Sequence, residues 1–572
     1  MGSLCPLLLL PWALLSLCQP GIILGCHTGS KVECQKASFV PGYNLVGKGF
    51  DIVSMKWKGA YVIDVETWAM ADGICQLCKN TQLGGNLQKV PDSVLDWRPR
   101  VNCLHSVTSK LYQSHESVLK DSTETTNDSW KLGLDLEQMD NKQVGGTYTE
   151  ITKFATERSK SDKYSFSSNE VNCKIYSFHL KDQPPLNSEF LNTLHSLPKE
   201  YTSKTATNFQ NFISTYGTHY IRQVELGGRV HSITALRTCE SAMKGVRVNE
   251  INDCLRNEAL DVVTGQPNKK LSEYCRGVSR KLNRDQTFHS VFSDRKTEVI
   301  GGLPGVHDIF SEGGSAEYTK WMNSLKTHPG IVSYDLRPLH MLVQENITQV
   351  NLKKAVRQYI LNKALSLICS SPCKVGSHRD PANPCLCKCH GQTSIDADCC
   401  PSKPGLATLV VTVVRAVGLY GDQITNTDAY VKVFYGSQRE QTQVITDNFP
   451  QWNKKFSFGL VDLSKSRAVQ FEVWDQDSYY DDLLGKCQFE LSRGEVTEKR
   501  CDLNHGSLYV SLSVECAPNL GGDHCQSYLP SPMSKEQAAH YMGCNLMPTL
   551  EPFLSALQNQ GWQRPANYTF GH

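Results

Sequence analysis

Apolar residues recur at helical spacing in one stretch of the chain and at strand spacing in several others. The stretch "LKKAVRQYILNKALSLI", residues 352–368, repeats apolar positions every three or four residues and predicts a long amphipathic helix. Farther on, "GLATLVVTVVRAVGL", "DAYVKVFYG" and "AVQFEVWD" are rich in β-branched and aromatic residues and are separated by turn residues. They predict an all-β sandwich over residues 405–516, followed by a tail, 517–572, with little pattern.

Two long polar blocks, residues 105–170 and 240–297, interrupt the part of the chain that precedes this helix. Polar segments of this length are uncommon in compact domains unless they are functional. The first block contains "WKLGLDLE", in which apolar residues alternate strictly with polar ones; these apolar residues are Trp130, Leu132, Leu134 and Leu136. The second contains "ALDVV", a weaker alternation. For either block alone, a half-buried strand with disordered flanks is the simpler interpretation. Two such blocks in one domain favour amphipathic strands of the kind that form a membrane barrel.

The length of these blocks is sufficient for a membrane hairpin. A block of about 60 residues folded once gives arms of about 30 residues, or ~100 Å at the rise of a strand. The hydrocarbon core of a bilayer is only ~30 Å thick. A single hairpin would leave unpaired backbone groups at its edges inside lipid, and only a closed barrel removes these edges. If the blocks insert, several copies of the chain must therefore assemble.

Composition and the start of the chain predict a secreted protein. A chain of 572 residues is too long to fold around one hydrophobic core, and its length indicates about three domains. The formal net charge of +2 does not indicate a partner such as nucleic acid. The stretch "MGSLCPLLLLPWALLSLCQPGIILGC" is apolar and broken by prolines, so we expect a signal peptide over residues 1–25 in preference to a membrane anchor. Three glycosylation sequons agree with secretion; they begin at Asn127, Asn346 and Asn567.

The cysteines predict disulfides, which an oxidising compartment permits. Of the 23, the two in the signal peptide are set aside. The others fall into local groups: Cys26, Cys34, Cys75 and Cys78; Cys103 with Cys173; Cys254 with Cys275; Cys487 with Cys501; and Cys516 with Cys525. Seven more lie in 369–400, a short module with no room for a core. Because seven is odd, we expect Cys239 to bond into this module, with Cys544 left over and the detailed connectivity open.

Two aspartate-rich loops, "YGDQITNTDAY" and "VWDQDSYYDDLLG", lie in the predicted sandwich. Their carboxylates are those of Asp422, Asp428, Asp475, Asp477, Asp481 and Asp482. Carboxylates clustered at one end of a sandwich repel one another unless a cation lies among them. Oxygen ligands in flexible loops suit Ca²⁺, so we favour a calcium site over a merely solvated acidic loop. Nearby aromatic residues are suited to a lipid interface; these are Tyr420, Tyr479, Tyr480 and Trp452.

The stretch "YGTHYIRQVELGG", residues 216–228, carries hydroxyl, imidazole and carboxylate groups, yet Thr218, His219 and Glu225 do not have a clear catalytic spacing. It resembles the signature of the MACPF family of pore-forming proteins. The resemblance implies an α+β MACPF domain over 26–368, with a bent antiparallel sheet and flanking helical clusters. An EGF-like module over 369–404 and a C2 domain over 405–516 would follow.

The resemblance further implies that the signature is structural. Residues Tyr216, Gly217, Thr218, His219 and Tyr220 would end a helix and enter a central strand. Gly227 and Gly228 would lie at a bend of the sheet, and Gly301 and Gly302 would close the second polar block. In the second aspartate loop, Asp481 and Asp482 compete for one ligand position, and the spacing to Gly485 favours Asp482.

The implied activity is calcium-dependent cytolysis without enzyme chemistry. The C2 domain would dock on the phospholipid membrane of a target cell through Ca²⁺. Subunits would form a ring-shaped homo-oligomer, and the polar blocks would line a transmembrane β-barrel. The protein would be stored in secretory granules and would deliver granule proteases through the pore in lymphocyte killing. Two alternatives are a calcium-dependent adaptor that never inserts and a lipase, which the chain disfavours because it lacks a Gly-x-Ser-x-Gly motif.

Overall fold

The computed structural model describes residues 25–103, 106–124, 128–136, 142–143, 149–282, 292–304, 309–310, 314–363, 365–366, 373, 377–381, 386–391, 395–421 and 424–533. Several predicted features lie outside these residues: the signal peptide up to residue 24, the sequon residues Asn127 and Asn567, Asp422, and the cysteines Cys369, Cys385 and Cys544.

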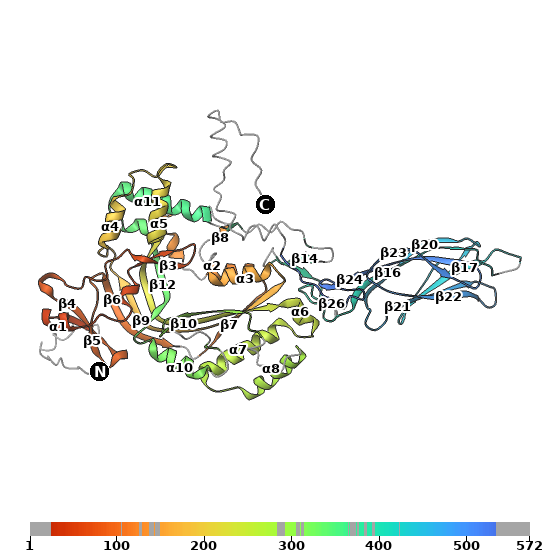
Figure 1. Cartoon of the computed structure of the whole chain (residues 1–572), viewed down its shortest axis with the longest axis horizontal. Helices are drawn as coiled ribbons and strands as arrows, with labels where there is room; N and C mark the ends of the chain where they lie inside the picture. The colour runs from red at the N-terminus through yellow and green to blue at the C-terminus, as the bar shows by residue number, and fades with distance from the viewer. Residues whose placement is uncertain are drawn as a thin grey trace, which may run out of the picture.

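Two long antiparallel strands, β9 (Tyr164–Leu180) and β10 (His219–Arg237), form the centre of an eight-stranded sheet. The other strands of this sheet are β2 (Lys48–Asp51), β3 (Lys56–Tyr61), β6 (Val94–Cys103), β7 (Thr108–Tyr112), β11 (Arg295–Ile300) and β12 (Gly330–Pro338). We call the end at His219 the head end, where β6 and β12 flank the central pair. The end at Arg237 is the base end, where β7 and β11 flank it. The sheet is visibly curved between the two ends (Figure 1).

Helices gather at both ends of this sheet (Figure 1). At the head end lie α4 (Ser188–His195), α5 (Ala206–Tyr216) and α11 (Asn346–Lys363). The amphipathic helix predicted over 352–368 is confirmed up to Lys363 as part of α11, which buries Leu352, Val356 and Ile360. Its predicted C-terminal end is wrong, because Leu365–Ser366 form the strand β13. At the base end, α2 (His115–Glu124) and α3 (Glu150–Ser159) cover the face of β10 that carries Ile233 and Ala235. The opposite face is covered by α6 (Thr238–Met243), α7 (Val248–Thr264), α8 (Lys269–Lys281) and α10 (Ser315–Ser324).

The prediction of a strand at "WKLGLDLE" is wrong for this structure. Residues Asp128–Lys131 form the 3-10 helix η4, and the chain then turns. Gly133 and Asp135 have positive φ values of 67° and 51°, which an extended strand does not accommodate. The turns bury Trp130, Leu134 and Leu136 in the core, whereas Leu132 is exposed. Tertiary burial at three of the four apolar positions therefore overrides the alternating pattern.

The prediction of a strand at "ALDVV" is also wrong. This stretch belongs to α7, because Ile251, Leu255, Ala259 and Val262 recur at three- and four-residue spacing and bury one helical face. The described part of the second block is thus mainly helical, and that of the first block contains α2, η4 and α3. The first block also forms the short strand β8 (Lys142–Gln143), which pairs with β13 (Leu365–Ser366).

Disulfides staple the parts of the chain that have little core of their own. The structure forms Cys26–Cys78 and Cys34–Cys75 around a small sheet of β1 (Cys26–Gly29), β4 (Cys75–Asn80) and β5 (Asn86–Lys89). Cys103–Cys173 joins β6 to β9, and Cys254–Cys275 joins α7 to α8. The cysteine-rich module contains β14 (Ser377–Arg379), β15 (Cys387–Cys389) and the bonds Cys373–Cys387 and Cys389–Cys399.

Residues 406–516 form a β-sandwich. One sheet contains β20 (Gln451–Asp462), β16 (Leu406–Val417), β24 (Ser507–Cys516) and β23 (Gly494–Asp502). The other contains β18 (Gln438–Gln441), β17 (Asp428–Tyr435), β21 (Ala468–Asp475) and β22 (Asp482–Glu490), with β19 (Ile445–Thr446) paired to β17. Alternate residues of β17 and β21 point into a shared apolar core. The predicted α+β class, with a bent antiparallel sheet, a disulfide-rich module and an all-β sandwich, is confirmed.

None of the helices in the described ranges has both the length and the apolar character needed to cross a bilayer.

Candidate functional site

The stretch 216–228 forms the junction between a helix and the central strand. Tyr216 ends α5, and Gly217 turns the chain with φ 83° and ψ −158°. A Cβ atom at Gly217 would overlap the carbonyl oxygen of Phe50 on β2, so only glycine fits there. The Thr218 hydroxyl accepts from Ile52 N at 3.0 Å and lies 3.2 Å from Phe50 O, which fastens β2 and the residues after it to the start of β10.

His219 is fully buried and uses both ring nitrogens in packing. Nδ1 lies 2.7 Å from Thr218 Oγ1, and Nε2 lies 2.9 Å from Trp130 O. Because a carbonyl oxygen can only accept, Nε2 carries the proton and donates it. Burial lowers the pKa of His219 to about 4, so the ring is neutral over most of the acidic range as well as at neutral pH. Glu225, farther along β10, pairs with Lys174 of β9. These contacts indicate that the polar side chains of Thr218, His219 and Glu225 have a structural role and hold neighbouring segments together.

The first glycine pair lies where the register of the central sheet shifts. The pairing of β10 with β9 is irregular between Leu226 and Gly227. A Cβ atom at Gly227 would overlap Cys173 O, and one at Gly228 would overlap the Trp321 ring of α10. Both residues must therefore be glycine for β9 and α10 to approach the strand so closely.

The second glycine pair packs against the first. Gly301 and Gly302, which follow β11, have φ values of 75° and 86°. A Cβ atom at Gly301 would overlap Gly227 O, and one at Gly302 would lie 2.5 Å from Trp321 Cδ1. The Trp321 indole N–H donates to Gly301 O at 3.0 Å. The sequence located both pairs separately, and the structure brings them together around one tryptophan ring.

A polar cavity of about 630 Å³ lies between the sheet and the helices α2 and α3. Alternate residues of adjacent strands line it, and they include Lys110, Glu170, Lys174, Arg229, His231 and Glu298. Burial lowers the pKa of His231 to about 4 and raises the pKa of Glu298. The face of the sheet that α2 and α3 cover is therefore strongly polar in its middle part, which sequence reasoning did not identify.

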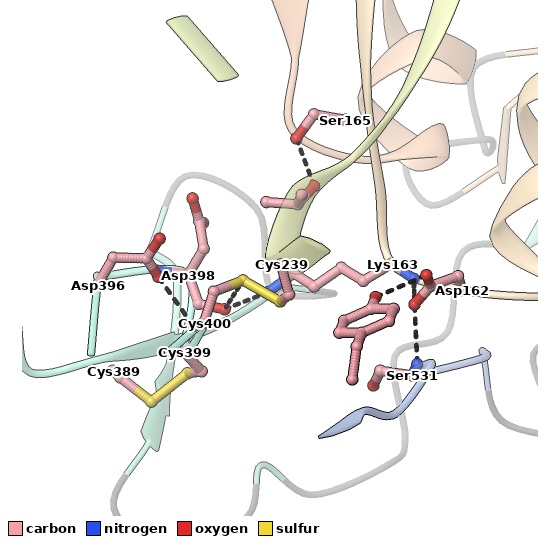
Figure 2. The surroundings of a disulfide bond; sticks show 12 residues. Asp162, Lys163, Ser165, Cys239, Cys389, Asp396, Asp398, Cys399, Cys400 and Ser531 are labelled. Carbon is pink, nitrogen blue, oxygen red and sulfur yellow. Dashed lines mark hydrogen bonds between the residues drawn. A yellow bond between two sulfur atoms is a disulfide. The ribbon is translucent and has the colours of Figure 1, made fainter. Parts of the chain in front are cut away.

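The two polar blocks join the sheet at its base end, next to the cysteine-rich module. Cys239, at the start of the second block, is bonded to Cys400 of that module. Lys163, just before β9, donates from Nζ to the backbone oxygen of Asp398 in the same module, as Figure 2 shows. The carboxyl group of Asp398 in turn pairs with Lys388 at 2.6 Å.

A C-terminal segment is fastened at the same place. Asp162 is buried and accepts hydrogen bonds from Tyr528 Oη at 2.6 Å and from Ser531 N at 2.9 Å (Figure 2). Met533 N donates to Ser159 O at the end of α3. The ends of both polar blocks are thus attached to later parts of the chain, and the contact of residues 528–533 was not predicted.

The aspartate loops meet at one end of the sandwich. Asp428, Asp475 and Asp482 lie on the neighbouring strands β17, β21 and β22, and Asp475 stands opposite Asp482 in the register. Asp475 is 1% exposed, and its Oδ1 accepts from Asp428 N at 2.6 Å. A Cβ atom at Gly421 would overlap the Asp475 carboxylate, so the first loop passes directly over it.

Asp481 points differently from Asp482. Its carboxylate accepts from Tyr430 Oη at 2.5 Å and from Asp477 N at 3.4 Å. Burial, together with the hydrogen bond to Asp481, raises the pKa of Tyr430 to about 12. Among the residues described, which omit Asp422, no three His, Cys, Asp or Glu side chains already form a group able to hold a metal. The all-oxygen donors and the close passage of Gly421 nevertheless fit a hard cation such as Ca²⁺.

Large apolar side chains surround this end of the sandwich. The most exposed are Tyr479 at 93%, Tyr480 at 86%, Ile424 at 96% and Phe449 at 58%. Trp452, which the sequence suggested for the same surface, is instead buried and donates from Nε1 to Gln443 O at 3.0 Å. Its position inside strand β20 turns it into the core.

Comparison with known families and proteins gives matches along most of the chain. The family model "MAC/Perforin domain" matches residues 39–367, "Perforin-1-like, EGF domain" matches 368–402, and "C2 domain" matches 407–505. Perforin-1 of Homo sapiens is 38% identical over 531 residues, which cover 91% of this chain and 96% of that protein. Perforin-1 of Mus musculus is 37% identical, covering 88% and 93%. Complement component C8 alpha chain of Oryctolagus cuniculus is 24% identical over 45% of each chain.

The glycine packing predicts that alanine lowers the stability unequally at two positions that have similar φ angles. Gly301→Ala should lower the stability of the sheet domain by about 2–4 kcal/mol, because backbone strain is added to a collision with Gly227. Gly265→Ala is the control, since Gly265 also has positive φ, 67°, but has no atom within 4 Å of the added carbon. Thermal unfolding of both variants measures the difference. Equal shifts in melting temperature would contradict the packing role of Gly301.

Proposed function

The chain belongs to the MAC/Perforin family, and on this premise we propose that it is a calcium-dependent pore-forming protein that docks on a target membrane, assembles into a ring and inserts its two polar blocks as β-hairpins. The observation that carries the proposal is the position of these blocks. Each connects two strands that already pair antiparallel at the base end of the sheet: β7 with β9, and β10 with β11. Each block is therefore able to extend an existing hairpin.

The registers of these pairs give the two hairpins similar lengths. Thr108 pairs with Glu170 and Tyr112 with Phe166, so continuing the register places the first turn near residue 139. Arg229 pairs with Ile300 and Thr234 with Arg295, which places the second turn near residue 265. The arms beyond the paired strands are then about 26 residues in the first hairpin and about 30 in the second, or ~85 Å and ~100 Å at strand rise. Arms of similar reach, well above the ~30 Å of hydrocarbon, suit one common barrel wall.

The polar cavity indicates which face of the sheet would line the inside of a barrel. Departure of α2 and α3 exposes the charged face of the sheet, with Lys110, Arg229 and Glu298 among its residues. A charged face suits a water-filled lumen. The edges of each sheet require partner edges, so a second copy of the chain is the partner that completes the backbone hydrogen bonds.

Docking is proposed to use the aspartate loops. Ca²⁺ would be held by Asp428, Asp475 and Asp482, together with Asp422 and Asp477, and would supply positive charge toward lipid phosphates. Asp482 is favoured over Asp481 because Asp482 stands opposite Asp475, while Asp481 binds Tyr430. The exposed rings of Tyr479 and Tyr480 are suited to the membrane interface.

The finer parts of the proposal rest on the family relationship. They are secretion into granules, release toward target cells and passage of granule proteases through the pore. Asn346 is exposed at the start of α11, which is compatible with a glycan there. The alternative of a membrane-binding adaptor shares the docking step but not the insertion. Dye release from liposomes in calcium separates the two, and analysis of lipid products separates both from a lipase.

Removal of one loop carboxylate should abolish docking. We expect Asp428→Ala or Asp477→Ala to prevent sedimentation with phosphatidylcholine liposomes in calcium and to leave the melting temperature of the sheet domain unchanged. Asp523→Ala is the matched control, because Asp523 is an exposed aspartate of the same half of the chain, outside the two loops. Wild-type sedimentation of either loop variant would show that the ligands are misassigned.

Tethering the first polar block should block lysis while docking persists. Ser129 and Asp335 are in side-chain contact, and cysteines at both positions would join the block to β12. The oxidised variant should sediment with liposomes without releasing dye, and mild reduction should restore release. A cysteine pair at Asp92 and Lys181, which form a 2.8 Å ion pair away from both blocks, controls for the added disulfide. Full dye release by the oxidised tethered protein would contradict insertion of this block.

A further inference from the structure

The part of the first polar block nearest to its proposed turn is stored at the wrong end of the sheet for insertion. We call residues Ser129–Leu136 the tip segment. The register of β7 and β9 places this segment within about ten residues of the turn near residue 139. A hairpin grows from the base end, where β7 ends at Tyr112 and β9 begins at Tyr164. The tip segment instead contacts residues at the head end of the sheet, beside His219.

Apolar side chains hold the tip segment in the main core. Trp130, Leu134 and Leu136 are 3%, 0% and 7% exposed, and all three belong to the same apolar cluster as Phe50 and Tyr220 of the head end. The Trp130 ring meets the His219 imidazole edge to face, with 6.0 Å between centroids. The segment is thus packed like core structure, although it lies inside a polar block.

Polar contacts from three other elements fix the same segment. His219 at the start of β10 donates from Nε2 to Trp130 O at 2.9 Å. Asp335 of β12 accepts from the Ser129 hydroxyl. On α11, Lys353 pairs with Asp135 at 2.7 Å, and Arg357 donates from Nε to Asp135 O at 3.2 Å. The buried bond to Trp130 matters most, since the ion pair at the exposed Asp135 is screened by water.

The second polar block is also packed in the main core close to its proposed turn. Its register places the turn near Gly265, where α7 ends. Ala259, Val262 and Val263 of α7 belong to the same apolar cluster as the tip segment, whereas residues 264–270 are exposed. The tip segment differs in the polar bonds that it makes to β10, β12 and α11 in addition to its apolar packing.

We propose that the signature residue His219, together with β12 and α11, forms a latch for the tip segment, and that opening of this latch is the step that controls insertion of the first polar block. This inference rests on the proposed pore-forming function and adds a controlling step to it. The first block is able to extend only once Trp130, Leu134 and Leu136 leave the core. The signature thus acts on insertion as a positioning element. It contacts the segment that crosses the membrane, in addition to shaping the sheet.

The test weakens the latch from the side of the tip segment, because substitution of the fully buried His219 can unfold the head end. Ser129→Ala removes the bond to Asp335, and Leu134→Ala removes core packing. Leu194→Ala is the matched control: Leu194 of α4 is 4% exposed in the same core but makes no part of either block. The readouts are hydrogen exchange of residues 129–136 in solution, and the lag before dye release from phosphatidylcholine liposomes in calcium.

A latch predicts that Ser129→Ala and Leu134→Ala speed exchange of the tip segment and shorten the lag. For the loss of one hydrogen bond the lag should shorten about fivefold. Sedimentation with liposomes should not change, and Leu194→Ala should not shorten the lag. A merely structural role predicts faster exchange with an unchanged or longer lag, and this result would overturn the latch. Failure of the wild type to release any dye would instead overturn the proposed function.

Discussion

The pairing of β7 with β9 and of β10 with β11 is the constraint on which the other features depend. An antiparallel register, once set, fixes which residues stand opposite each other in any extension of the hairpin. Continued through the blocks, the two registers put the proposed turns near residues 139 and 265 and give arms of similar length. Cys103–Cys173 joins the neighbouring strands β6 and β9, and the glycine pairs around Trp321 fit β10 and β11 closely together, so the strands that begin both hairpins are held rigidly. The proposed conformational change is therefore confined to the two polar blocks between these strands.

Before any hairpin forms, the apolar residues of both polar blocks must be buried by other packing. The helices α7 and α8 bury one face of the second block and are closed by Cys254–Cys275. The first block divides, with α2 and α3 over the polar face of the sheet and the tip segment in the main core. At the base end, Cys239–Cys400 and the bonds to Asp162 and Lys163 attach both blocks to the later modules. The observed fold and the proposed barrel would thus use the same side chains with different packing partners.

The sequence was sufficient for the features that depend on local chemistry. Strand runs such as "DAYVKVFYG", the helical stretch 352–363 within α11 and the grouping of cysteines all followed from spacing and composition. The strands predicted at Trp130–Leu136 and at Ala259–Val263 failed for a shared reason. The apolar spacing of each stretch is compatible with a strand and also with the structure observed, which is a 3-10 helix with turns in the first and an α-helix in the second. Only the surrounding core selects between these structures. The meeting of Gly227 with Gly301, and of His219 with Trp130, joins residues far apart in the chain, so no local pattern predicts it.

The location of the tip segment after assembly tests the central claim most directly. Leu132 is exposed in the fold before any insertion, so a fluorescent probe on Leu132→Cys should leave that fold intact. Its fluorescence is followed on liposomes whose quenching lipids are confined to the inner leaflet. Insertion predicts that quenching accompanies dye release, because a segment near the turn must cross the bilayer. Dye release without quenching from the inner leaflet would show that the pore forms without this segment and would contradict the account.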